Sequence, residues 1–177
     1  LLVEELSILS CLLLGLVCAR PTILSGADLS GADLSSANLS GALLSGADLT
    51  DAVVVDSAGT AAYHAGEAPD RRSAAAAHRR GIRLGGKARR FDAEDFDRFD
   101  YVVPMDAANE RDLLALAPDD AARAKVKLLR DYDPRSPAGS EVPDPYYGGE
   151  DGFEKVLDIC VAGCRGLLAQ VRDDHDL

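Results

Sequence analysis

The residues best suited to chemistry lie in the last third of the sequence, where an aspartate stands between two prolines. Asp144 is flanked by Pro143 and Pro145, and Tyr146 and Tyr147 follow directly. The prolines restrict the backbone on both sides of the carboxyl group, and the tyrosines can form aromatic walls beside a phenyl ring. A solvated aspartate in a turn is common for Asp-Pro pairs. The adjoining Tyr-Tyr-Gly-Gly nevertheless favours a site in which this carboxyl group transfers a proton.

Three other motifs carry polar side chains, and each lies at or shortly after the end of a short apolar run. Residues 55–60 read V-D-S-A-G-T and include Ser57, residues 63–70 begin with Tyr63 and His64, and residues 105–109 read M-D-A-A-N. Short apolar runs bounded by turn residues are typical of buried strands. The polar motifs are therefore expected to lie in loops.

The elements that must position these loops alternate between strands and helices. Strands are predicted in the apolar run 6–19 and at 53–56, 100–105 and 126–129, and helices at 70–80, 93–99, 107–116 and 153–171. This alternation predicts a three-layer α/β fold with a four-stranded parallel sheet and helices on both faces. Ligands of such sheets bind beyond the carboxyl ends of the strands, so the polar loops should converge there.

In this order, the motifs D-S-A-G-T and D-P-Y-Y-G-G resemble those of the low-molecular-weight protein tyrosine phosphatases, over about residues 53–170. The resemblance implies hydrolysis of phosphotyrosine or another aryl phosphate monoester through a phospho-cysteine. It assigns Asp144 as the general acid that protonates the leaving oxygen and then activates water. It places Tyr146, Tyr147 and Tyr63 at the mouth of the site and Ser57 in the network that supports the phosphate loop.

The nucleophile loop of that family, V-C-x-G-N-x-C-R-S-P-T, is not intact in this sequence. Aligned without gaps, residues 12–22 match it at Gly15, Cys18, Pro21 and Thr22. Leu13 stands at the position of the nucleophilic cysteine and Ala19 at that of the phosphate-binding arginine.

A gapped alignment instead makes Cys11 the nucleophile and Arg20 the phosphate ligand. It places Leu12, Leu13 and Leu14 in a loop whose backbone must approach the anion closely, which disfavours it.

The loss of the loop predicts that the chain is inactive as written. Removing a catalytic nucleophile costs on the order of 10⁶ in turnover, and removing an arginine that stabilises a transferring phosphoryl group costs about 10³ to 10⁵. Asp144 cannot replace either group, because an acid without a nucleophile only assists departure of the leaving group.

The sequence between the degraded loop and residue 53 has a different texture. From Ala27 it repeats with a period of five, as in ADLSG and ANLSG, which matches the pentapeptide-repeat pattern. We expect three segments within a single domain: an apolar strand and degraded loop (1–26), a repeat segment (27–52) and a phosphatase-like α/β unit (53–177).

Two alternatives to an inactive phosphatase follow from this change of texture. The first alternative is a non-catalytic module that binds phosphate or protein. Otherwise the natural protein is an active phosphatase whose true N-terminus is misassigned, since the sequence begins with Leu.

The composition of the chain disfavours some classes of partner and ligand. The net charge of −11 disfavours nucleic acid, whose phosphates are met by clustered Lys and Arg. The four cysteines and three histidines lack the spacing of a zinc site, so we expect no metal and no cofactor. Cys160 and Cys164 lie on the apolar face of the last helix and should be core residues.

The apolar run 6–19 is too short to span a membrane comfortably. A cytoplasmic protein acting on phosphotyrosine proteins or small aryl phosphates is expected.

Overall fold

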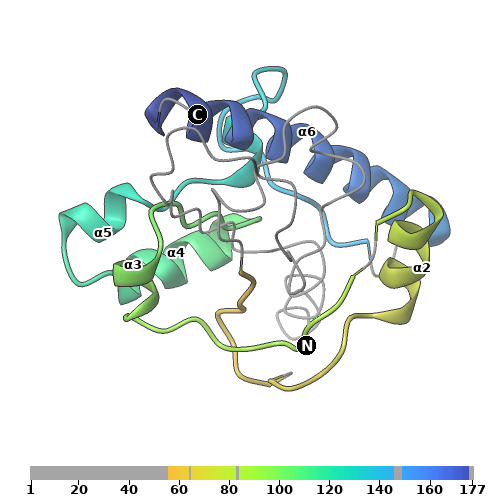
Figure 1. Cartoon of the computed structure of the whole chain (residues 1–177), viewed down its shortest axis with the longest axis horizontal. Coiled ribbons are helices and arrows are strands. Elements are labelled where there is room, and N and C mark those ends of the chain that lie inside the picture. The colour runs from red at the N-terminus through yellow and green to blue at the C-terminus, as the bar shows by residue number, and fades with distance from the viewer. Residues whose placement is uncertain (1–55, 64, 83, 146–148, 176–177) are drawn as a thin grey trace, which may run out of the picture.

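The computed structural model describes residues 56–63, 65–82, 84–145 and 149–175. Its elements, labelled in Figure 1 apart from the 3-10 turn, are α2 (Arg71–Arg79), α3 (Asp95–Arg98), α4 (Ala107–Leu116), α5 (Asp120–Ala124), the 3-10 turn η1 (Leu129–Tyr132) and α6 (Gly149–His175). The helices predicted at 70–80, 93–99, 107–116 and 153–171 are confirmed as α2, α3, α4 and α6. The short helix α5 was not predicted, because five residues are too few to show a period.

Aspartates begin three of these helices. The Asp70 carboxylate accepts hydrogen bonds from the backbone N–H groups of Arg72 and Ser73 at the start of α2. Asp106 and Asp119 cap α4 and α5 in the same way. An N-cap carboxylate satisfies N–H groups that have no partner inside the helix. Part of the negative charge of the sequence therefore serves local structure.

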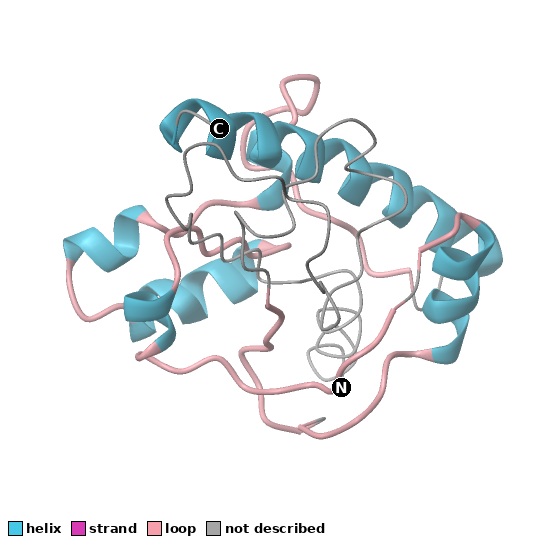
Figure 2. Ribbon diagram, in the orientation of Figure 1, coloured by secondary structure: helices cyan, strands magenta, loops and turns pink. Residues whose placement is uncertain are grey.

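Two of the segments predicted as strands are joined by a single parallel bridge, between Val102 and Val126. The Val102 N–H donates to the Lys125 carbonyl oxygen at 2.9 Å, and the Lys127 N–H donates to Val102 at 3.0 Å. The next rung would need an N–H from residue 104, which is a proline and has none. Within the described residues the pairings are isolated bridges, and Figure 2 draws them as loop.

The strand predicted at 126–129 needs correction at its end. Leu129 still donates to the Pro104 carbonyl oxygen at 3.0 Å, but it already begins the 3-10 turn η1. With the ladder interrupted at Pro104, the chain turns, and the Asp131 N–H bonds back to Leu128. The predicted strand at 6–19 and most of that at 53–56 lie outside the described residues.

Helices cover both faces of the segment around Val102, as predicted for an α/β fold. Val102 belongs to a core with Phe91, Phe96, Phe99 and Leu113, which come from α3, α4 and their flanking loops. Its neighbour Val103 belongs to the other core, which is built by α2, η1 and α6. Successive side chains of an extended segment point to opposite faces, so this segment separates the two helix layers.

The long helix α6 packs along η1 and against α2, at one edge of the molecule in Figure 1. Ion pairs join α2 to α6: Arg79 and Arg80 bind Glu154, and Arg80 also binds Asp158. No helix within the described ranges is long and apolar enough to cross a membrane.

Candidate active site

The first turn of α4 is the junction of two loops that the sequence singled out. The buried Asp106 caps this helix, because its carboxylate accepts the Asn109 N–H at 2.7 Å and the Asn109 side-chain amide at 2.7 Å. The amide oxygen of Asn109 in turn accepts the Thr60 hydroxyl at 2.9 Å. The structure therefore joins the D-S-A-G-T loop to the M-D-x-x-N motif, two motifs expected to lie together.

The segment around Ser57 is fixed by a charged network. The Ser57 N–H donates to the Asp56 carboxylate at 2.7 Å, and Arg89 holds the other oxygen of Asp56 at 2.8 Å. The backbone supports the same connection, because Gly59 donates to the Arg89 carbonyl oxygen at 2.8 Å. Ser57 is half-buried on this frame.

Arg89 also reaches the fully buried carboxylate of Asp95, at 2.7 Å. Burial alone would lower the pKa of Arg89, but the carboxylates of Asp95 and Asp56 outweigh it and raise the pKa. The guanidinium group is therefore permanently charged, and it bridges the Ser57 loop to α3.

The loop that carries Asp144 is attached to the same end of α4. The Val142 N–H donates to the Met105 carbonyl oxygen at 2.8 Å, and the Glu141 carboxylate accepts the Ala107 N–H at 2.9 Å. On the far side of Asp144, the buried Pro145 lies against the first turns of α6. Asp144 itself is half-buried between these two attachments.

Two of the N–H groups at the start of α4 are already bonded to carboxylates of this chain. Exposed N–H groups at a helix start favour negative ligands, but here the carboxylates of Asp106 and Glu141 already occupy those of Asn109 and Ala107. These two N–H groups are therefore not available to a phosphate group.

The cysteines of the described residues, Cys160 and Cys164, lie on α6 and do not supply a nucleophile. Cys160 is buried in the core and Cys164 packs against it, as predicted. Burial raises the pKa of Cys160 well above its usual value and that of Cys164 to about 12. Both thiols stay protonated at neutral pH, and thiolates are the nucleophilic form.

The remaining predicted site residues fall into two groups. Tyr63, expected at the mouth of the site, is 71% exposed. Tyr146 and Tyr147 lie outside the described residues, as do Cys11, Leu13, Ala19 and Arg20. Within the described ranges, no group of His, Cys, Asp and Glu is arranged to hold a metal ion.

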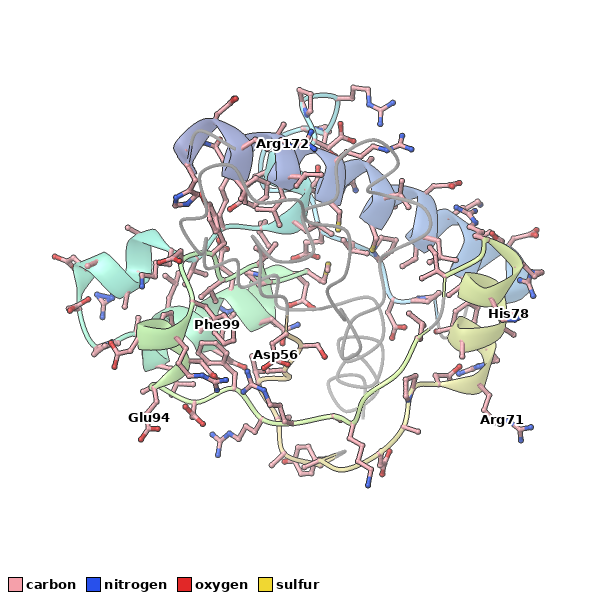
Figure 3. All side chains as sticks on the ribbon, viewed as in Figure 1. Asp56, Arg71, His78, Glu94, Phe99 and Arg172 are labelled. Atoms are coloured by element: carbon pink, nitrogen blue, oxygen red, sulfur yellow. The ribbon has the colours of Figure 1, made fainter. Side chains whose placement is uncertain are left out.

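The basic residues of α2 do not form an anion pocket with these loops. Arg71 and His78 are exposed, and Figure 3 shows them projecting outward from α2. Arg72 is paired with Asp70 at 3.0 Å.

Sequence reasoning missed three residues that hold the two loops: Glu141, Arg89 and Gly152. Glu141 is 34 positions from its partner Ala107, and Arg89 is 33 positions from Asp56. Neither pairing has a local signal. The position of Glu141, three residues before the acid in E-V-P-D, is the one hint that the motif offered.

Comparison with known proteins decides the family. The family model for low molecular weight phosphotyrosine protein phosphatase matches residues 36–177. This chain belongs to that family. The match begins inside the predicted repeat segment and does not include residues 12–22, where the sequence predicts a degraded loop.

Curated relatives of this chain are named as members of the same family. The chain is 45% identical over 119 residues to a putative low molecular weight protein-tyrosine-phosphatase of Synechocystis, covering 67% of this chain and 75% of the relative. It is 48% identical over 122 residues to the low molecular weight protein-tyrosine-phosphatase of Streptomyces coelicolor, covering 68% and 74%.

Solved structures support the same fold. A protein tyrosine phosphatase from Entamoeba histolytica, crystallised with Hepes in its active site, superposes with a TM-score of 0.71 at 33% identity, covering 80% of this chain and 88% of that one. YfkJ from Bacillus subtilis superposes with a TM-score of 0.65 at 35% identity, covering 71% and 77%. These similarities establish the α/β low-molecular-weight phosphatase fold.

Proposed function

We propose that this chain retains the proton-donor half of an aryl phosphate monoester hydrolase and has lost the step that forms a phospho-cysteine. Asp144 is the proposed general acid, with Tyr146, Tyr147 and Tyr63 around the aromatic ring of a phosphotyrosine. The observation that carries the proposal is the attachment of both the Asp144 loop and the Ser57 loop to the first turn of α4.

The lost step follows from the residue types in the loop. Leu13 and Ala19, at the positions of the nucleophilic cysteine and the phosphate-binding arginine, have no ionisable group. Cys160 and Cys164 cannot substitute, because they are protonated in the core. A leaving-group acid without an attacking thiolate has little effect on the barrier, since nucleophile loss alone costs on the order of 10⁶ in turnover.

The fold that supports this proposal is a four-stranded parallel sheet. Two of its strands would be the bridged segments around Val102 and Val126, and the other two would come from residues 6–19 and 53–56. In that arrangement the loop after the first strand meets the Ser57 and Asp144 loops at one edge of the sheet.

The test is hydrolysis of p-nitrophenyl phosphate by the full chain and by its Asp144→Ala, Cys11→Ser and Cys18→Ser variants. We expect all four proteins to release p-nitrophenol at the rate of the buffer. Turnover that disappears in both Asp144→Ala and Cys11→Ser, but persists in Cys18→Ser, would refute the proposal. It would instead support a site built from Cys11, Arg20 and Asp144.

A further inference from the structure

Glu141 connects the Asp144 loop to α4 through both its side chain and its backbone. Its carboxylate accepts the Ala107 N–H at 2.9 Å, and its carbonyl oxygen accepts a hydrogen bond from Arg130 at 3.0 Å. The same guanidinium group donates to the Ser136 hydroxyl at 2.8 Å. Glu141 is therefore held from two directions, although its side chain lies at the surface.

The position of this contact on α4 strengthens it. Ala107 is the first residue of the helix, and its N–H has no partner within the helix. A carboxylate at this end also interacts favourably with the helix dipole. Hydrogen bonds to ionised acceptors are about twice as strong as neutral ones, so the bond to Glu141 is a firm attachment.

The chain between Glu141 and Asp144 is too stiff to absorb a movement. Val142 precedes Pro143 and Asp144 precedes Pro145, and a residue before proline is restricted to extended conformations. The buried Val142 is itself bonded to Met105 at 2.8 Å. A displacement at Glu141 is therefore transmitted to Asp144.

The other end of the Asp144 loop, at Pro145, is held by close packing against α6. A Cβ atom at Gly152 of α6 would lie 3.3 Å from the Pro145 carbonyl oxygen and 3.4 Å from its Cβ atom. Pro145 thus rests closely on the start of α6, so the end of the loop that a substitution can release is the one at Glu141.

We propose that Glu141 is a positioning residue for Asp144, which it orients by fastening the loop to the first turn of α4. The proton-donor role of Asp144 rests on the proposed function; the fastening by Glu141 does not. Neither the spacing of the motif nor the family resemblance assigns Glu141 a role.

The experiment is amide exchange and chemical-shift analysis by NMR on the full chain. In Glu141→Ala, the Val142 amide should exchange about tenfold faster or more, because a charge-assisted bond that restrains it is gone. The backbone signals of Asp144 should shift, while the amides of Val156 and Leu157 in α6 keep their exchange rates. Glu141→Gln, which retains an oxygen acceptor, should recover most of the protection at Val142 and move the Asp144 signals back.

The matched control is Glu110→Ala. Glu110 lies in the first turn of α4, and its carboxylate makes no hydrogen bond to the described residues. This variant removes the same charge near the same helix end without touching the loop, so Val142 and Asp144 should be unchanged.

Three results would overturn the positioning role. These are a Val142 exchange rate within twofold of the unmodified chain in Glu141→Ala, an equal acceleration in α6, or the same effect in Glu110→Ala. The measurement requires no turnover. Its failure would therefore leave the hydrolysis assay informative, and turnover in that assay would leave this result standing.

Discussion

The two helix layers on either side of the segment around Val102 are stabilised by different interactions. On the side of α6, the contact with η1 depends on close packing of the two backbones. A Cβ atom at Gly166 would lie 1.8 Å from the Tyr132 carbonyl oxygen, and one at Gly163 would lie 2.6 Å from the Leu129 side chain. Only glycine permits the backbones of α6 and η1 to approach this closely.

On the side of α3, the contacts depend on ion pairs. Arg89 joins the buried Asp95 to Asp56, and the exposed Arg98 reaches Asp95 at 3.2 Å. Each side supports one candidate loop: the α6 side holds Pro145 next to Asp144, and the α3 side holds Asp56 next to Ser57. The comparison indicates that the contact between α6 and η1 is sensitive to added volume, and that the Ser57 loop is sensitive to charge.

The largest effect is expected from Gly166→Ala. The new methyl group would collide with a backbone carbonyl, so η1 must move, and we expect the free energy of unfolding to fall by about 3 kcal/mol. Urea denaturation would measure it. Gly152→Ala is the matched control, because the nearest atom is 3.3 Å away and the change should stay below about 1 kcal/mol. Equal losses in the two variants would contradict a shape-determined interface.

The second largest effect is expected from Arg89→Met. This change leaves the fully buried Asp95 carboxylate with fewer partners, and we expect a loss of about 2 kcal/mol in stability. Arg98→Met removes a partner of the same carboxylate that is 61% exposed, and its loss should be below about 1 kcal/mol. If Arg98→Met is as damaging as Arg89→Met in urea denaturation, the burial argument is wrong.

A smaller, pH-dependent effect is expected at the end of α6. The Tyr101 hydroxyl donates to Asp174 at 2.7 Å and Gln170 donates at 2.8 Å, which holds the pKa of Asp174 below its usual value of 3.8. The ionised form is thus favoured in the folded state. Its stabilisation is complete above the unfolded-state pKa and is lost as the pH falls through the lower folded-state pKa.

Asp174→Asn should therefore lower Tm at pH 7, and the difference from the unmodified chain should shrink below about pH 4. Asp173→Asn changes the same charge on the same turn, but its carboxylate has no hydrogen bond to the described residues. A pH-independent difference for Asp174→Asn, or an equal response of Asp173→Asn, would disprove this role of Tyr101.

The smallest effect is expected for the coupling between the two sides. Gly163 and Arg89 share no contact, so the losses of Gly163→Ala and Arg89→Met should add to within about 0.5 kcal/mol in the double variant. A larger deviation in urea denaturation would mean that the segment between the two cores transmits strain from one side to the other.

Much of the helical structure could be predicted because its causes are local. The boundaries of α4 match the prediction, since Asp106 supplies the cap and Ala117 ends the helix in an extended conformation. The apolar period of α6 predicted its buried face, including Cys160. The interrupted ladder was not predicted, although Pro104 stood in the sequence. The missing N–H of Pro104 interrupts the ladder only because the fold places residue 104 opposite Lys127.

The sequence by itself predicted the family motifs and most of the helices. It also predicts the loss of the nucleophile loop, because no fold can give Leu13 a thiolate or Ala19 a positive charge. Only the tertiary structure decided how the remaining site residues are held. Glu141 finds Ala107 across 34 positions and Arg89 finds Asp56 across 33. Such pairings depend on where whole segments pack, and packing is decided by the two cores rather than by any local pattern.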